Sequence, residues 1–289
     1  MSLIGVGLLG GSLGLALRRR NLSKCVVGFV RRTGSVRECE RVGSVHKATQ
    51  DLEEAVSGAD LIVLCTPIAQ MRPLVLQMLA VVSPGAVITD VGSVKASVVR
   101  DLEPLAARAG SFFIGSHPMA GGERMGVAAA RADLFEQAVC AVTPTRRSNP
   151  AALEKVEKLW KSIGCRVLRL EPDLHDALVS RSSHLPHFLA ATLVHRVLGT
   201  KAPKSQAALC ANGFRDTTRI ASGSPEMWRD IAVANRKHIR KSLSLLIGDL
   251  QKMQRLIDKG DVRSIERFLT EAKSRRDQWQ SLGSGKSEE

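Results

Sequence analysis

The sequence predicts an α/β fold, in which a doubly wound and mainly parallel sheet is followed by an all-helical region. Three observations predict it. A glycine-rich turn follows the first short apolar run, apolar runs and helical patterns then alternate, and the strand signal stops near residue 171. Such alternation is typical of a parallel sheet with crossover helices. We therefore expect one domain over residues 1–170, a helical domain over 171–281 and a flexible tail over 282–289.

The glycine-rich turn has the spacing of a dinucleotide-binding motif. Gly5 permits a tight turn, Gly7 lets the backbone approach a pyrophosphate, and Gly10 lets the next helix pack closely on its strand. That helix directs its positive amino end at the phosphates. A Rossmann-type domain is therefore expected. Its predicted cofactor-binding residues include Gly5, Gly7, Leu8, Leu9 and Gly10, with Thr66 and Pro67 at the end of the third expected strand.

The remaining elements of the first half follow from short apolar runs and from apolar residues at helical spacing. Strands are expected at residues 2–6, 25–30, 61–66, 86–91, 112–116, 138–143 and 165–170. Helices are expected at residues 12–20, 33–42, 51–56, 69–82, 95–109 and 149–163. Only four residues precede Gly5, so either the first strand is unusually short or the natural start lies upstream.

The second half is expected to be helical, with helices at residues 173–198, 205–211, 225–257 with possible breaks, and 262–279. One apolar stripe recurs at helical spacing and is wide enough for burial. It consists of Leu243, Leu246, Ile247, Leu250, Met253 and Leu256. Such a stripe forms either part of a core or a dimer interface.

Composition excludes several classes of protein. No run of eighteen apolar residues is present, and no basic segment precedes the first apolar stretch, so neither a membrane span nor a signal peptide is expected. The net charge is +14, but only 3% of residues are aromatic and the basic residues are spread out, which argues against nucleic-acid binding and favours anionic small molecules. Six singly placed cysteines suit reduced thiols in the cytoplasm.

The end of the second expected strand indicates which nicotinamide cofactor binds. An acidic residue there hydrogen-bonds the ribose 2′-hydroxyl of NAD, whereas an arginine can accommodate the 2′-phosphate of NADP. This strand is followed by Arg31, Arg32 and Thr33, with no acid at that position. The Arg31 guanidinium can present a planar fork of donors to a phosphate. We expect a preference for NADP, with NAD also possible.

Four later segments and the opening glycines together resemble the prephenate/arogenate dehydrogenase family of tyrosine biosynthesis. These segments are residues 90–95 (Asp-Val-Gly-Ser-Val-Lys), 115–121 (Gly-Ser-His-Pro-Met-Ala-Gly), 183–187 (Ser-His-Leu-Pro-His) and 213–219 (Gly-Phe-Arg-Asp-Thr-Thr-Arg). The likeness spans roughly residues 3–260. It implies a homodimer, a nucleotide-binding domain followed by a helical dimerisation domain, and oxidative decarboxylation of a cyclohexadienyl substrate.

The resemblance also implies roles for individual residues. His117 corresponds to the histidine that contacts the C4 hydroxyl of the substrate, and Ser93 to the serine that helps to orient it. Arg219 corresponds to the arginine that binds the ring carboxylate. Further residues implied to line the substrate pocket are His187, Glu123 and Trp228.

Residue chemistry supports these assignments and leaves competing structural roles open. A base that titrates near neutrality is needed to take the hydroxyl proton, and neutral histidine suits this task. Ser93 could equally cap the helix expected at 95–109. His184 and His187 lie three apart, but no third ligand is evident, and Pro186 suggests a helix distortion rather than a metal site. For His175 we expect a structural hydrogen bond across the domain junction.

Three functional alternatives remain at this point. The first is the enzyme that the resemblance implies, for which we favour prephenate, giving 4-hydroxyphenylpyruvate, over arogenate, giving tyrosine, or a dual cyclohexadienyl dehydrogenase. The charges of Glu123 and Arg124 favour opposite substrates. A more distant alternative is a dehydrogenase of the 3-hydroxyacid or ketol-acid type, and the third is a basic binding protein without activity. We expect neither a fused chorismate mutase nor an appended regulatory domain, so any feedback by tyrosine would act at the substrate pocket.

Overall fold

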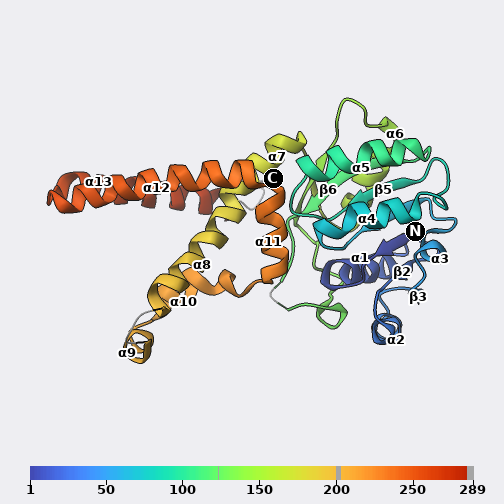
Figure 1. The fold of residues 1–289 in the computed structure, drawn as a ribbon, viewed down its shortest axis with the longest axis horizontal. Coiled ribbons are helices and arrows are strands. Elements are labelled where there is room, and N and C mark those ends of the chain that lie inside the picture. The colour runs from blue at the N-terminus through green and yellow to red at the C-terminus, as the bar shows by residue number, and fades with distance from the viewer. Residues whose placement is uncertain (123, 200–202, 285–289) are drawn as a thin grey trace. The chain divides into compact units, whose positions relative to one another are not determined.

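One sheet forms the centre of the first half of the chain (Figure 1). In the computed structural model, which describes residues 1–122, 124–199 and 203–284, eight strands are ordered β3-β2-β1-β4-β5-β6-β7-β8. They are β1 (Ser2–Ile4), β2 (Val27–Phe29), β3 (Lys47–Thr49), β4 (Leu61–Leu64), β5 (Val87–Asp90), β6 (Phe112–Pro118), β7 (Val139–Thr143) and β8 (Arg166–Arg169). All neighbours are parallel except β6 and β7. The predicted mainly parallel sheet is confirmed.

Two features of the sheet were not predicted from the apolar pattern. Strand β3 carries a single apolar side chain, Ala48, so no apolar run indicates it. The antiparallel pairing of β6 with β7 follows a long connection, residues 119–138, whose direction no local pattern reveals. Strand β1 has only three residues, yet it pairs with both β2 and β4 in the middle of the sheet.

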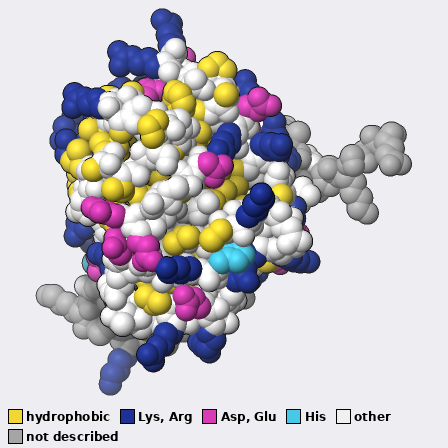
Figure 2. Space-filling view, turned by 90° about the vertical axis from the view of Figure 1, so that its right-hand side faces the viewer, with side chains coloured by type: hydrophobic (Ala, Val, Ile, Leu, Met, Phe, Trp, Pro, Cys, Tyr) yellow, Lys and Arg dark blue, Asp and Glu magenta, His cyan; other side chains and the backbone are white. Residues whose placement is uncertain are grey.

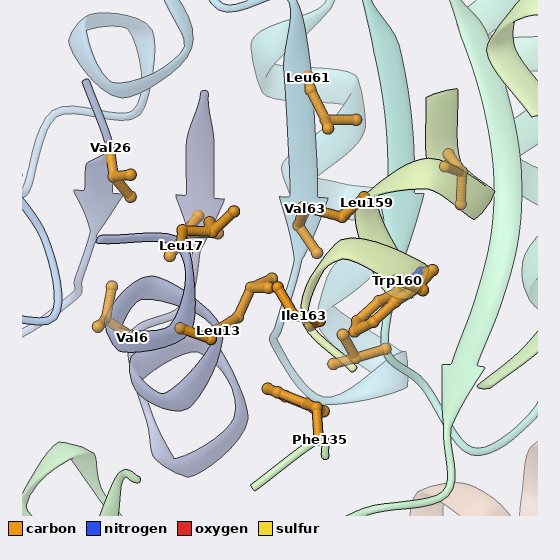
Figure 3. Packing of buried hydrophobic residues seen from close by; sticks show 14 of the residues in the cluster. Val6, Leu13, Leu17, Val26, Leu61, Val63, Phe135, Leu159, Trp160 and Ile163 are labelled. Carbon is orange, nitrogen blue, oxygen red and sulfur yellow. The ribbon is translucent and has the colours of Figure 1, made fainter. Parts of the chain in front are cut away.

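Helices cover both faces of the sheet. Successive side chains of each strand point to opposite faces, and the apolar ones on each face are buried against helices. On one face, Leu3 and Val63 pack against α1 and α6 (Figure 3). On the other face, Ile62 and Leu64 pack against α3, α4 and α5. These helices, with α2 beside α1, are α1 (Leu8–Arg19), α2 (Thr33–Val42), α3 (Leu52–Val56), α4 (Ile68–Met78), α5 (Ala96–Arg108) and α6 (Pro150–Ser162).

The second half is helical, as the sequence predicts. Its elements are α7 (Pro172–Val179), a π-helical turn η2 (Ser180–His184), α8 (Leu185–Leu198), α9 (Pro203–Ala208), α10 (Asn212–Thr218), a 3-10 turn η3 (Arg219–Ser222), α11 (Pro225–Ala234), α12 (Arg236–Asp258) and α13 (Val262–Ser284). The single helix expected at residues 173–198 is interrupted by η2, which ends two residues before Pro186, close to the distortion that this proline predicts. The helix expected at residues 225–257 is broken at Asn235, whose side chain is used for tertiary contacts.

Contacts divide the chain into two compact units, Met1–Ile239 and Arg240–Glu289. The first unit therefore contains the sheet with its covering helices, together with α7, α8, α9, α10 and α11. The domain boundary between residues 170 and 171 stays a prediction. Helix α13 continues to Ser284, and residues 285–289 of the expected flexible tail lie outside the described residues. None of the helices in the described ranges is long and apolar enough to cross a membrane.

The glycine turn between β1 and α1 has the close contacts that its spacing predicts. Gly5 has a φ of +97°, a conformation that side chains disfavour. A Cβ atom on Gly10 would lie 2.1 Å from the Gly5 carbonyl oxygen, so helix and strand could not approach as closely with any other residue. The turn lies between β1 and β4, where the strand order reverses. In open α/β sheets this is the position at which ligands bind.

Candidate active site

The amino end of α1 is open towards the reversal point of the sheet. A Cβ on Gly7 would meet no atom within 4 Å, and no side chain caps the helix there. The first turn of α1 also carries no acidic residue. At the end of β4, the hydroxyl oxygen of Thr66 is buried without a hydrogen-bond partner. Free amide groups, an uncovered glycine and an unpartnered hydroxyl fit the pyrophosphate of a dinucleotide.

Basic side chains follow the end of β2, as expected. Arg31 and Arg32 are exposed there, and Thr33 begins α2 with its hydroxyl 3.1 Å from Gln50 Oε1. A surface hollow of about 560 Å³ along α2 is lined by Arg32, Arg37 and other residues that include a single acid, Glu38. On the face seen in Figure 2, Lys and Arg side chains are dispersed among other types of side chain.

A buried ion pair stabilises the loop between β5 and α5. Lys95 Nζ pairs with Asp90, and both side chains are fully buried. The Lys95 ammonium also donates to the Ser116 carbonyl at 2.8 Å, while Asp90 Oδ1 accepts from the Ser116 amide at 3.0 Å. The ends of β5 and β6 and the start of α5 are thereby tied together. Because β6 continues directly into His117, the ion pair also fixes the backbone of that histidine.

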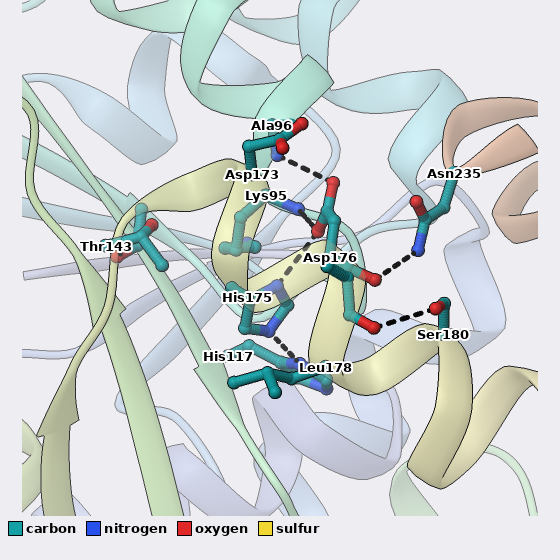
Figure 4. A network of polar contacts seen from close by, with 12 residues as sticks. Lys95, Ala96, His117, Thr143, Asp173, His175, Asp176, Leu178, Ser180 and Asn235 are labelled. Atoms are coloured by element: carbon teal, nitrogen blue, oxygen red, sulfur yellow. Dashed lines mark hydrogen bonds and ion pairs between the residues drawn. The ribbon is translucent and has the colours of Figure 1, made fainter. Parts of the chain in front are cut away.

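His117 lies at one end of a buried polar network (Figure 4). Its Nδ1 lies 2.9 Å from Nε2 of His175, and Nδ1 of His175 lies 2.9 Å from Oδ1 of Asp176. The two carboxylate oxygens of Asp176 also accept from the backbone amides of Lys95 at 2.7 Å and Ala96 at 2.9 Å. Asp176 therefore caps α5 and joins it to α7, and the hydrogen bond expected for His175 is formed.

The burial of His117 determines its charge. Burial lowers its pKa well below the ordinary value of 6.5, and His175, Lys95 and His184 lower it further. Burial likewise lowers the pKa of His184 to about 4, against an opposing effect of Asp176. Both imidazoles are therefore neutral at physiological pH, and only a neutral imidazole can accept a proton.

Two of the predicted pocket residues lie together. The rings of His187 and Trp228 are stacked, with centroids 3.5 Å apart and planes inclined by 8°. A Cβ on Gly223 would lie 2.6 Å from Trp228 Nε1, so this glycine permits the close approach of η3 and α11. Nδ1 of His187 is buried without a partner.

This pair is connected to His117 by successive contacts. Asn235 Nδ2 donates to the Asp176 carbonyl at 2.9 Å and lies 3.2 Å from His184 Nδ1, and the His184 ring meets Trp228 edge to face. The chain of contacts runs through His117, His175, Asp176, Asn235, His184, Trp228 and His187. Within the described ranges, no group of three or more His, Cys, Asp or Glu side chains could hold a metal ion.

The remaining predicted site residues are placed as follows. Arg219 begins the exposed turn η3, which packs on α8, and the next residue, Ile220, forms a backbone hydrogen bond with the His187 ring. Ser93 is half-buried and makes no hydrogen bond with His117. The suggestion that Ser93 caps α5 is wrong, because Asp176 occupies that role. Glu123 lies outside the described residues.

Several residues of this network were not identified as functional from the sequence. Asp90 and Lys95 lie within a segment that carries the family resemblance, but their pairing across the loop has no local signal. Asp176 and Asn235 belong to no motif that indicates a site. Asn235 contacts a residue 59 positions away in the sequence, and Asp176 contacts one 81 positions away. Only the tertiary structure reveals such contacts.

The fold and this network define the chain as a nucleotide-binding protein of the dehydrogenase type. Two family profiles match it, one described as prephenate dehydrogenase, nucleotide-binding domain, over residues 13–169, and one described as prephenate dehydrogenase, dimerization domain, over residues 171–271. The chain belongs to the prephenate dehydrogenase family.

Individual relatives agree with this assignment. The chain is 32% identical to the prephenate dehydrogenase of Bacillus subtilis over 95% of this chain and 74% of the relative. The crystal structure of prephenate dehydrogenase from A. aeolicus with hydroxyphenyl propionate and NAD+ is similar, with a TM-score of 0.90, 30% identity and 96% of each chain covered. The arogenate dehydrogenase of Synechocystis gives a TM-score of 0.82 and 31% identity, over 96% of this chain and 99% of that one.

The buried neutral histidines predict how stability depends on pH. In the unfolded chain His184 binds a proton below about pH 6.5, whereas in the folded chain it does so only below about pH 4. Between these values the unfolded state binds more protons, so the free energy of unfolding rises with pH and levels off above about 6.5. We expect His184→Phe to lower this slope by up to about 1.4 kcal/mol per pH unit.

Urea denaturation at a series of pH values measures the slope independently of the absolute stability of each variant. The exposed His195, on α8, provides the control, and His195→Gln should leave the slope unchanged. An unchanged slope in His184→Phe would contradict the burial of a neutral His184.

Proposed function

We propose that the protein catalyses the oxidative decarboxylation of prephenate to 4-hydroxyphenylpyruvate, with hydride transfer to NAD(P)+. The observation that carries this proposal is a buried, neutral His117 beside the carboxyl ends of the parallel strands, in a chain that also presents an open dinucleotide turn. The family membership and the prephenate dehydrogenase names of its relatives support the choice of substrate.

The chemistry requires a proton to be held briefly and then returned. The oxidised nicotinamide, when bound, accepts hydride from C4 of the substrate. His117 takes the C4 hydroxyl proton in the same step, which leaves a dienone that still carries the ring carboxylate. When CO2 departs, the electron pair of the broken bond makes the ring aromatic, and His117 returns the proton to the phenolate oxygen. Burial lowers the pKa of His117 well below 6.5, not to near neutrality, so the ring is uncharged and can accept the proton in the first step and return it in the second.

Substrate binding is assigned to the residues around the stacked pair. We assign the ring carboxylate to Arg219, because a guanidinium can hold a carboxylate through two parallel hydrogen bonds. His187 and Trp228 form one wall of the proposed pocket. The hydrogen bond between the His187 ring and the Ile220 backbone holds the turn that carries Arg219. We also assign Glu123 and Ser93 to substrate binding, the latter from the loop between β5 and α5.

Arogenate is the alternative substrate. The Synechocystis relative is named an arogenate dehydrogenase, and its similarity to this chain is nearly as high as that of the A. aeolicus enzyme. Arogenate differs from prephenate in carrying an ammonium group where prephenate has a ketone. Prephenate remains our first choice because the chain, with a net charge of +14, favours an anion without that ammonium.

We assign NADP as the preferred cofactor. Arg31 and Arg32 follow β2 in the place where an acid would bind the ribose 2′-hydroxyl of NAD. Thr33 is adjacent and Arg37 lies in the same surface hollow as Arg32, so positive side chains dominate this end of the crevice. NAD remains usable, because the free amide groups in the first turn of α1 would bind the pyrophosphate, which both cofactors share.

We further propose a homodimer and a cytoplasmic location. The family profiles meet at residues 169 and 171, which supports a domain boundary between residues 170 and 171, and the second is described as a dimerization domain. Helices α12 and α13 expose large apolar side chains that a second copy of the chain can cover. These include Leu245, Ile247, Leu250, Ile257, Phe268 and Leu269. All six cysteines are free thiols, which suits a reducing compartment.

A substrate panel tests the proposed activity. Absorbance of the reduced nicotinamide is followed with prephenate, arogenate and 3-hydroxyisobutyrate, each with NADP and NAD. We expect prephenate with NADP to give the highest kcat/KM. His117→Ala should lower kcat by about 10²–10⁴-fold, the typical contribution of a general base, and leave the Kd of NADP unchanged. The exposed control His195→Gln should behave as the unaltered protein. Faster turnover of 3-hydroxyisobutyrate, or an active His117→Ala variant, would contradict the proposal.

A second variant tests the choice of cofactor. Arg31→Ala should raise the KM for NADP by about tenfold or more, as expected for loss of a charge-assisted hydrogen bond of ~1.5–3 kcal/mol, with little change for NAD. Arg108→Ala, in the last turn of α5, is the matched control because it removes an exposed arginine away from β2. Equal effects on the two cofactors would show that Arg31 does not bind the 2′-phosphate.

A further inference from the structure

The network around His117 determines which of its two ring nitrogens can accept a proton. We propose that His175 and Asp176 are positioning residues that hold His117 in one tautomer, with its proton on Nδ1 and the lone pair on Nε2. This inference rests on the proposed function, in which His117 takes the substrate proton. The contacts of His117 with His175 and of His175 with Asp176 carry it (Figure 4).

The direction of the hydrogen bonds is set at the Asp176 end. Backbone amides can only donate, and those of Lys95 and Ala96 point at the two oxygens of Asp176 at 2.7 and 2.9 Å. With the positive end of α5 beside it, the carboxylate is already stabilised as an anion and can act only as an acceptor. The nearby His175 Nδ1, 2.9 Å from Oδ1, must therefore carry a proton and donate it.

The same reasoning then applies to the two imidazoles. A neutral His175 with its proton on Nδ1 has only a lone pair on Nε2, so Nε2 accepts. The partner at 2.9 Å is Nδ1 of His117, which must donate. His117, neutral because it is buried, has then used its one proton. Nε2 of His117 is left with a lone pair, which is the form that a general base requires.

A second proton on His175 would reverse this outcome. An imidazolium at His175 would donate from Nε2, so His117 would accept at Nδ1 and carry its own proton on Nε2, where it could not act as a base. Burial opposes that state, because His175 is 1% exposed and a charge on its ring would lose its hydration.

The arrangement has a functional consequence during proton transfer. When Nε2 of His117 takes the substrate proton, the ring becomes positive while its Nδ1–H still donates to His175. The Nδ1–H of His175 in turn donates to the Asp176 carboxylate, so both hydrogen bonds strengthen and neither needs to reverse. A histidine forced into the wrong tautomer in the Ser-His-Asp triad loses about 10⁴-fold in kcat, which sets the scale of the effect expected here.

NMR spectroscopy measures the tautomer of His117 directly. Long-range ¹H–¹⁵N correlation spectra of the ¹⁵N-histidine-labelled protein distinguish a protonated ring nitrogen from an unprotonated one, and His117→Gln assigns the signals of His117. We expect protonated Nδ1 and unprotonated Nε2 for His117 in the unaltered protein. His175→Phe keeps a ring but offers no acceptor, so the Nδ1–H form should lose its preference and kcat should fall about 10²-fold or more while KM changes little.

A conservative variant of His175 distinguishes loss of the hydrogen bond to His117 from a general disturbance of the structure. His175→Gln retains a side-chain oxygen that can accept from His117, so it should recover part of the kcat and of the Nδ1–H signal lost in His175→Phe. The exposed control His195→Gln should change neither. A proton on Nε2 of His117 in the unaltered protein would overturn the inference, as would a His175→Phe variant with unchanged tautomer and kcat. An active His117→Ala variant would instead defeat the proposed function and leave the tautomer measurement standing.

Discussion

The Asp176 carboxylate, at the amino end of α5, is the contact on which the rest of the site depends. It accepts hydrogen bonds from two backbone amides of α5 and from His175, all within buried surroundings. Its own backbone carbonyl accepts from Asn235 at the break between α11 and α12. One residue of α7 thus contacts the start of a sheet-covering helix, His175 of the histidine pair and, through Asn235, His184.

The buried pair of Lys95 and Asp90 is the second constraint. Two fully buried charges are costly to desolvate, and such a pair is retained only where further hydrogen bonds satisfy it. Here Ser116 supplies both a carbonyl and an amide, so the pair holds the end of β6 against β5. These contacts fix the backbone at His117 at the carboxyl ends of the parallel strands, which is also the edge of the sheet that carries the glycine turn.

The sequence predicts the elements well where the physical signal is local. Apolar runs indicate the central strands, and the glycine spacing predicts the close contact of Gly10 with Gly5. It fails where the determinant is distant. Pro186 predicts a distortion close to the π-helical turn, and breaks are expected within residues 225–257, but the position of the break at Asn235 is not predicted because tertiary contacts of that side chain mark it. The same limit applies to the site, since the acid that caps α5 comes from α7 and is not the adjacent Ser93.

A crystal structure of the protein with oxidised cofactor and a 4-hydroxyphenyl carboxylic acid would test the central claim most directly. That claim is that His117 faces the substrate with Nε2 while Nδ1 stays on His175. The account predicts the phenolic oxygen within hydrogen-bond distance of His117 Nε2, with the contacts from His175 to Asp176 unchanged. A phenolic oxygen bound elsewhere, or a His117 ring that has left His175 to reach it, would contradict the account.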